Sequence, residues 1–161
     1  ATMPSTRLRK AGGAFTIAGV LAVSLVGAWE GLRTTAYRDI VGVPTVCFGE
    51  TRGVEMGDEY TVEECQVMLG DGLMEFEAGM RNCLTNPDAI PEESYVAFLS
   101  LSYNIGTGGF CRSTVARRAN AGDIEGACEA ISMWNRAGGR VVQGLVNRRA
   151  DERRLCLEGV D

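Results

Sequence analysis

The stretch EGLRTTAYRDIVGVPT, residues 30–45, contains a glutamate, an aspartate and a threonine at Glu30, Asp39 and Thr45. Glu30 follows an apolar run, and a carboxyl group packed against apolar neighbours such as Trp29 loses solvation and stays protonated near neutral pH. Asp39 falls in a more polar setting, which keeps its carboxylate ionised. Two carboxyl groups in such opposed environments suit the hydrolysis of a glycosidic bond. Thr45 follows six residues after Asp39, and its hydroxyl is expected to orient a water. Spacing alone is also compatible with an ordinary surface pair of acids.

Local signals predict a mainly α chain with a small antiparallel β-hairpin, an α+β fold with an N-terminal hydrophobic helix. Glu30 is expected to begin a short helical piece that contains Leu32, Arg33 and Tyr37. Residues 39–53, rich in Gly, Val and Thr, predict the hairpin. Capping residues, a proline and apolar spacing predict further helices: Thr61 to about Arg81, Pro91 to Tyr103, Ser113 to Gly122, Asp123 to near Trp134, and Leu145 to Leu157.

The composition excludes several classes of hydrolase, because the 161 residues include no histidine. Serine and cysteine hydrolases that use an imidazole base are excluded, and so are zinc enzymes with histidine ligands. Acid–base work therefore falls to carboxylates, with no metal and no cofactor expected. The formal net charge of −5 argues against a nucleic-acid partner. Acids dominate residues 47–111 and arginines dominate residues 112–156, which indicates either a basic face for an anionic polymer or simply a solvated surface.

Residues 11–28, AGGAFTIAGVLAVSLVGA, carry no charge and follow the basic residues Arg7, Arg9 and Lys10. A basic flank before an uncharged run is typical of an export signal or a membrane anchor. A helix of this length spans about 27 Å, against a bilayer core of about 30 Å, and its many small residues would hold it loosely in lipid. Three interpretations stay open: a signal peptide cleaved after Ala28, a membrane anchor, or a buried core helix.

The chain has six cysteines and no CxxC pair. An even number of widely spaced cysteines is typical of three disulfides in an oxidising compartment, although six buried free thiols are the alternative. The cysteines are Cys47, Cys65, Cys83, Cys111, Cys128 and Cys156.

Several motifs together resemble the phage T4-type lysozymes, glycoside hydrolase family 24. They are Glu30-x8-Asp39-x5-Thr45 followed by VCFGET, YNIGTG at residues 103–108, AGD at residues 121–123, Trp134, AGG at residues 137–139, and Gly144-Leu145-x2-Arg148-Arg149-x2-Glu152. The resemblance covers about residues 29–158 and implies a lysozyme-like fold. It also implies a muramidase that cleaves the β-1,4 bond between N-acetylmuramic acid and N-acetylglucosamine with inversion.

The resemblance implies a role for each matching residue. Glu30 is the general acid, Asp39 positions or activates the water, and Thr45 completes the catalytic group. Asn104, Trp134 and Arg148 match substrate-binding positions of the cleft. One departure is Glu50, which occupies a position where the family commonly has a histidine, and a third acid near the cleft can disturb the first two.

The weakly apolar N-terminal run and the scattered cysteines resemble the signal-anchor-release endolysins of phages that infect Gram-negative bacteria. This implies two parts, residues 1–28 as basic flank and anchor and residues 29–161 as catalytic domain. It also implies a monomer that residues 11–28 tether, inactive, to the host inner membrane. Release into the periplasm then allows it to cut peptidoglycan for host lysis. Because Glu30 lies two residues beyond Ala28, an anchored helix would keep the site incomplete, which favours release over cleavage.

Nearest-neighbour spacing and the family likeness suggest the disulfides Cys47–Cys65, Cys83–Cys111 and Cys128–Cys156. Two other functions stay open. A lytic transglycosylase would use Glu30 alone, and an inactive membrane-anchored protein would bind peptidoglycan or regulate lysis.

Overall fold

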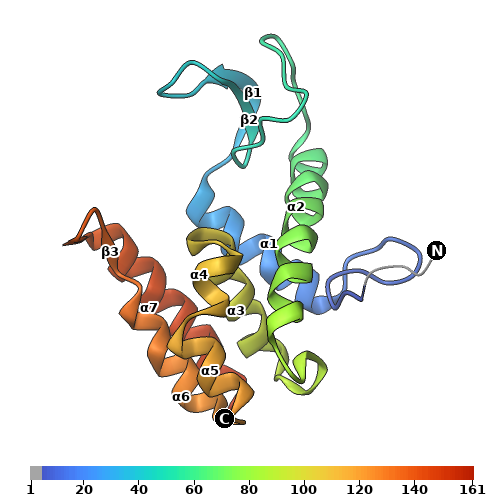
Figure 1. Cartoon of the computed structure of the whole chain (residues 1–161). Helices are drawn as coiled ribbons and strands as arrows, with labels where there is room; N and C mark the ends of the chain where they lie inside the picture. Colours follow the sequence, from blue (N-terminus) through green and yellow to red (C-terminus); the bar gives the residue numbers. More distant parts are fainter. Residues whose placement is uncertain (1–4) are drawn as a thin grey trace.

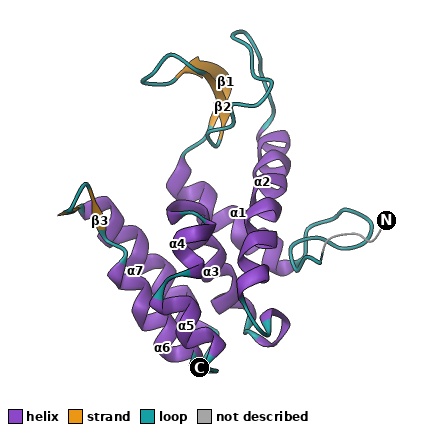
Figure 2. Cartoon of the chain, in the orientation of Figure 1, coloured by secondary structure: helices purple, strands orange, loops and turns teal. Residues whose placement is uncertain are grey.

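The computed structural model describes residues 5–161, which form a mostly helical body with two short strand pairs (Figures 1 and 2). The predicted α+β class is confirmed. The helices are α1 Ile17–Glu30, α2 Val62–Cys83, α3 Glu92–Ile105, α4 Thr107–Cys111, α5 Thr114–Asn120, α6 Ile124–Ala130 and α7 Gln143–Glu158. The strands are β1 Arg33–Arg38, β2 Pro44–Cys47, β3 Arg136–Ala137 and β4 Arg140–Val141, and short 3-10 turns cover Pro87–Ala89 and Ile131–Met133.

Capping side chains begin several helices where the sequence predicts them. The Thr61 hydroxyl accepts from the Glu64 backbone N–H at 3.1 Å, and the Glu64 carboxylate accepts from the Thr61 N–H at 2.9 Å. This reciprocal pair is the predicted capping box of α2. Ser113 and Asp123 likewise accept from backbone N–H groups at the starts of α5 and α6.

The helical piece predicted to begin at Glu30 is wrong. Glu30 is the last residue of α1, and the chain turns at Gly31, whose φ of 79° suits a residue without a side chain. The next residues, with two threonines and Tyr37, form strand β1, which pairs antiparallel with β2 in the register Tyr37 to Thr45. The hairpin therefore begins earlier than predicted, and Asp39 lies in its turn.

Helix α3 is the centre of the core, because α1, α2 and α7 all pack against it. Residues 94–102 of α3 are buried without interruption, as expected for a helix enclosed on all sides. Helix α1 contributes mainly small side chains to this core, among them Ala18, Ala22 and Val26. These small side chains let α1 and α3 approach closely.

The chain before α1 is docked on the body rather than free. The Thr6 hydroxyl and the Arg7 backbone N–H donate to the buried carboxylate of Glu77, at 2.5 and 2.9 Å. The Tyr95 hydroxyl donates to the same carboxylate at 2.5 Å. Leu8 is only 1% exposed. The segment that carries the basic flank is thus packed against the body, with Leu8 in the core and Lys10 exposed.

Helix α1 has 14 residues and runs through the boundary predicted between residues 28 and 29. Among residues 5–161, no helix combines the length and apolar character needed to cross a membrane. Residues 1–4 of the predicted first segment lie outside the described residues.

The structure contains the three disulfides that the sequence analysis suggests. Each one joins neighbouring elements: Cys47–Cys65 links β2 to α2, Cys83–Cys111 links α2 to α4, and Cys128–Cys156 links α6 to α7.

The docked N-terminal segment leaves no room for a side chain at Gly19 of α1. A Cβ at this position would overlap the carbonyl oxygen of Leu8, a backbone atom that cannot rotate away. We expect Gly19→Ala to lower stability by about 1–3 kcal/mol, measured by thermal or denaturant unfolding. Gly144→Ala is the matched control, because Gly144 is also helical and has open space at its Cβ. Equal stability of the two variants would contradict the docked arrangement.

Candidate active site

Glu30 is held at the end of α1 by its contact with α7. Its Oε2 lies 3.4 Å from Arg148 Nη1, and the two side chains are 26% and 5% exposed respectively. The Trp29 indole instead donates to Asp151 at 3.0 Å. The apolar setting predicted for Glu30 is therefore wrong in its main feature, because a guanidinium faces the carboxylate.

Arg148 belongs to a buried charge cluster that the sequence analysis missed. Glu152, fully buried, lies with Oε2 3.4 Å from Arg148 Nε and with Oε1 2.7 Å from Arg149 Nε. Ser100 of α3 donates to Glu152 Oε2 at 2.5 Å. Burial raises the pKa of Glu152, while Arg149, Ser100 and Arg148 oppose that rise. The spacings i, i+3 and i, i+4 along α7 were the available signal.

Asp39 and Thr45 are brought together in the β1–β2 hairpin through Val43. Asp39 Oδ1 accepts from the backbone N–H groups of Val41 and Val43, at 3.0 and 2.8 Å. The buried Thr45 hydroxyl donates to the Val43 carbonyl oxygen at 2.9 Å. Among the described residues, no hydrogen bond joins this pair to Glu30. The connection is through the chain, since β1 follows α1 after two residues.

Asn104 and Trp134, both predicted to bind substrate, line one cavity of about 380 Å³. Arg149 also lines it, and its guanidinium donates to the Asn104 side-chain oxygen at 2.9 Å and to the Trp134 carbonyl oxygen at 3.4 Å. One arginine thereby fixes both residues. Arg148, the third predicted substrate-binding residue, faces Glu30 and does not line this cavity.

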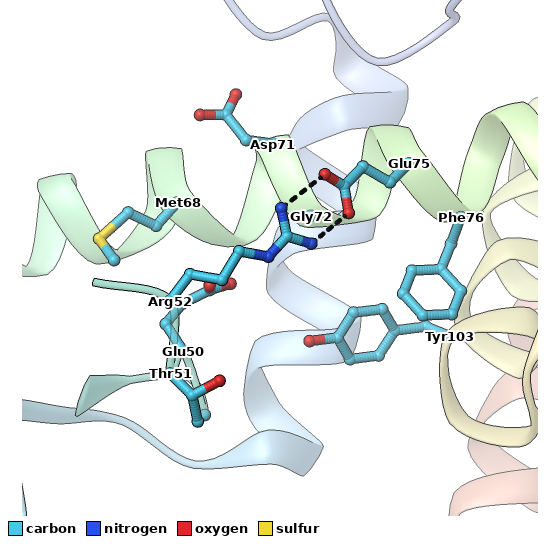
Figure 3. A pocket seen from close by; sticks show the side chains of 10 residues that line it. Glu50, Thr51, Arg52, Met68, Asp71, Gly72, Glu75, Phe76 and Tyr103 are labelled. Atoms are coloured by element: carbon cyan, nitrogen blue, oxygen red, sulfur yellow. Dashed lines mark hydrogen bonds and ion pairs between the residues drawn. The ribbon is translucent and has the colours of Figure 1, made fainter. Parts of the chain in front are cut away.

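A second cavity, of about 320 Å³, lies between the segment after β2 and helix α2 (Figure 3). Arg52 forms a two-point ion pair with Glu75 there, at 3.1 and 2.8 Å. Burial raises the pKa of Glu50, which Arg52 opposes and Glu75 and Asp71 reinforce. The residue in the family's histidine position is thus a carboxylate facing further carboxylates.

Tyr103 of α3 lines the second cavity. Its ring contacts Phe76 edge-on, with 4.9 Å between ring centroids, and its hydroxyl points away from Phe76 into the cavity (Figure 3). Burial raises the pKa of Tyr103, and the negative charges of Glu30 and Glu50 add to this rise. In the sequence, Tyr103 is distinguished only as the first residue of the YNIGTG motif, which does not indicate its place in the site.

A mostly helical body, with an acid at the junction to a two-stranded hairpin that holds a second acid, is typical of lysozyme-like glycoside hydrolases. A family model described as phage lysozyme matches residues 27–152. The chain therefore belongs to the phage lysozyme family.

Two relatives and one solved structure illustrate the likeness. The SAR-endolysin of Enterobacteria phage P21 is 43% identical over 151 residues, which cover 92% of this chain and 90% of that protein. The SAR-endolysin of Bacteriophage PS119 is 42% identical over 151 residues, 92% of this chain and 89% of that protein. A crystal structure of a P22 lysozyme mutant superimposes with a TM-score of 0.77 at 31% identity, covering 84% of this chain and 94% of that one. The protein is a glycoside hydrolase of the lysozyme type, a muramidase endolysin for host lysis.

The surroundings of Glu50 predict how stability depends on pH. Because its folded-state pKa is raised, the folded protein holds that proton more tightly, and this group costs stability as pH rises through the raised pKa. We expect Glu50→Gln to raise Tm by about 1–3 °C near pH 7, with the gain vanishing near pH 3.5.

Glu75→Gln is the control with the opposite sign. Its hydrogen bonds and charge contact with Arg52 lower the pKa of Glu75, so removing its charge should lower Tm slightly at neutral pH. A neutral-pH loss of stability in Glu50→Gln would contradict the interpretation of its surroundings.

Proposed function

We propose that Glu30 is the general acid that cleaves the β-1,4 bond between N-acetylmuramic acid and N-acetylglucosamine in peptidoglycan. The observation that carries this proposal is the contact between Glu30 and Arg148. At 3.4 Å, it is longer than the 2.7–2.9 Å typical of a charge-assisted hydrogen bond. Arg148 therefore orients Glu30 Oε2 without a strong bond. Glu30 Oε1 remains to hold the proton for the leaving oxygen.

Asp39 and Thr45 position the attacking water in this mechanism. The two backbone N–H groups that donate to Asp39 Oδ1 fix the plane of the carboxylate. Oδ2 accepts no hydrogen bond from the described residues and is the oxygen that receives a water proton. Thr45 spends its own proton on Val43, so its hydroxyl oxygen accepts from the water rather than donating to it.

Asn104 and Trp134 bind a sugar unit in the cavity that they share. An aromatic ring and a fixed amide at one cavity wall suit the apolar faces and the hydroxyl and acetamido groups of an amino sugar. Arg148 contributes to substrate binding indirectly in this proposal, through the orientation of Glu30.

Residues 11–28 tether the protein to the inner membrane before it acts in the periplasm, and the released protein works as a monomer. The uncharged run behind a basic flank supports the tether, as do the names of the SAR-endolysin relatives. The docked α1 supports release, because Glu30 reaches Arg148 only when α1 lies on α3 and α2.

Mass spectrometry of purified peptidoglycan after digestion tests the chemistry. We expect fragments with hydrated muramic acid ends, and a loss of activity of about 100-fold or more in Glu30→Gln and in Asp39→Asn. Glu125→Gln, an exposed acid in the first turn of α6, is the control and should keep full activity. Anhydro-muramic ends would establish a transglycosylase and remove the role of Asp39. Absence of fragments from the oxidised full chain would favour the binding or regulatory alternative.

A truncated chain that begins at Trp29 tests the role of α1. This truncation removes Ala22, Val23 and Val26 from the core together with the turns that support Glu30. We expect it to lose muramidase activity and to unfold at a lower temperature than the full chain. Full activity in the truncated chain would contradict both the release proposal and the structural role of α1.

A further inference from the structure

Glu152 lies between the candidate acid and the candidate sugar cavity. The functions proposed above give it no role. Glu152 is fully buried on α7, yet its carboxylate touches two arginines that point to different parts of the site. We propose that Glu152 is a positioning residue for the reaction. It holds Arg148 at a set distance from Glu30 and holds Arg149 against Asn104. This inference rests on the proposed role of Glu30 as the acid.

Both arginines reach the same oxygen of Glu152, because Arg148 Nε and Arg149 Nη2 each donate to Oε2 at 3.4 Å. Oε1 lies 2.7 Å from Arg149 Nε, while Oε2 lies 3.4 Å from Arg148 Nε and accepts from Ser100 at 2.5 Å. Ser100 belongs to α3, so the carboxylate is fixed from a second element as well as from its own helix. A buried carboxylate held at three points gives both guanidinium groups a fixed reference.

Arg148 lies between two carboxylates of unequal burial. Its Nε faces the fully buried Glu152 at 3.4 Å, and its Nη1 faces Glu30, also at 3.4 Å. Its Nη2 is buried with no hydrogen-bond partner among the described residues. The guanidinium is therefore not locked by Glu30 itself. Without the charge of Glu152, Glu30 becomes the nearest anion, and Arg148 is drawn toward it.

A closer Arg148 would weaken Glu30 as an acid. An opposite charge within about 4–6 Å favours the ionised carboxylate, and an ionised Glu30 has no proton to donate. Glu152 thus keeps Arg148 near enough to orient Glu30. Because the Arg148 charge is also paired with Glu152, it stabilises the ionised form of Glu30 less. Arg149 extends the same control to the cavity, because it bonds both Asn104 and the Trp134 carbonyl oxygen.

Other charged and titratable groups face this pair from neighbouring elements. The negative charges of Glu30 and Glu50 raise the pKa of Tyr103 on α3, and the positive charge of Arg148 lowers it. Glu50 lies in the segment that follows strand β2. Neither Tyr103 nor Glu50 is altered in a Glu152 variant. A change in the pH profile of that variant therefore reports on the two arginines.

The test is the dependence of kcat on pH, with saturating purified peptidoglycan and the full oxidised chain. We expect Glu152→Gln to move the alkaline limb to lower pH by about 1 unit, which lowers kcat about 10-fold near neutral pH. KM should rise as well, because Arg149 loses its anchor. Glu77→Gln is the matched control: it also removes a buried carboxylate, but one that contacts Thr6, Arg7 and Tyr95. It should lower Tm and leave the pH profile unchanged.

A double variant keeps the test decisive if Glu152→Gln folds poorly. Glu152→Gln with Arg149→Gln removes one buried negative and one buried positive charge, so the interior stays balanced. Arg148 has still lost Glu152, and the same shift of the alkaline limb is expected. An alkaline limb at the wild-type pH in the folded single or double variant would overturn the proposal. Retained activity in Glu30→Gln, measured in parallel, would instead overturn the assignment of the acid.

Discussion

Glu30 occupies the last position of α1, so every contact that holds this helix also determines where the candidate acid lies. The helix is held by shape more than by large apolar side chains. Gly19 lies against the Leu8 carbonyl, Gly27 lies against the ring of Phe48, and Ala22 is completely buried. Small residues permit this close packing and also keep the helix weakly apolar. The same composition suits both the tight interface observed here and the loose membrane tether proposed above.

Two buried carboxylates organise the surroundings of α3. Glu77 of α2 accepts hydrogen bonds from the chain before α1, and Glu152 of α7 forms ion pairs with two arginines. Helix α3 supplies one hydroxyl to each, Tyr95 to Glu77 and Ser100 to Glu152, both at 2.5 Å. A buried charge is costly unless it is paired and hydrogen-bonded. The hydroxyl groups of α3 therefore offset part of the free-energy cost of burying these two carboxylates on α2 and α7.

The parts of the fold that depend on neighbouring residues could be predicted from the sequence. The capping box at Thr61 and the cap at Asp123 involve partners three residues away, so their helices begin as expected. Strand β1 could not be predicted in the same way, because the apolar run before it is compatible with a helix that continues past Glu30. Gly31 ends that helix, and pairing with β2 then determines the strand.

The docked N-terminal segment and the ion pair of the acid could not be predicted, because their partners are distant in the chain. Thr6 and Arg7 meet Glu77 across 71 and 70 residues, and Glu30 meets Arg148 across 118. A basic flank before an uncharged run is typical of a membrane anchor, and nothing local indicates a folded partner. The candidate residues were found by motif, but their surroundings depend on tertiary contacts.

The disulfides divide the protein into a part that they cross-link and an N-terminal part that they do not reach. All three bonds lie between residues 47 and 156, and each closes a loop of 18 or 28 residues. Among the described residues, no disulfide ties residues 5–46 to the rest, although this portion includes α1 and the candidate acid. Disulfide formation therefore cross-links the body without fixing the N-terminal portion to it. In the proposed release, helix α1 therefore docks without a disulfide onto a body that three disulfides already cross-link.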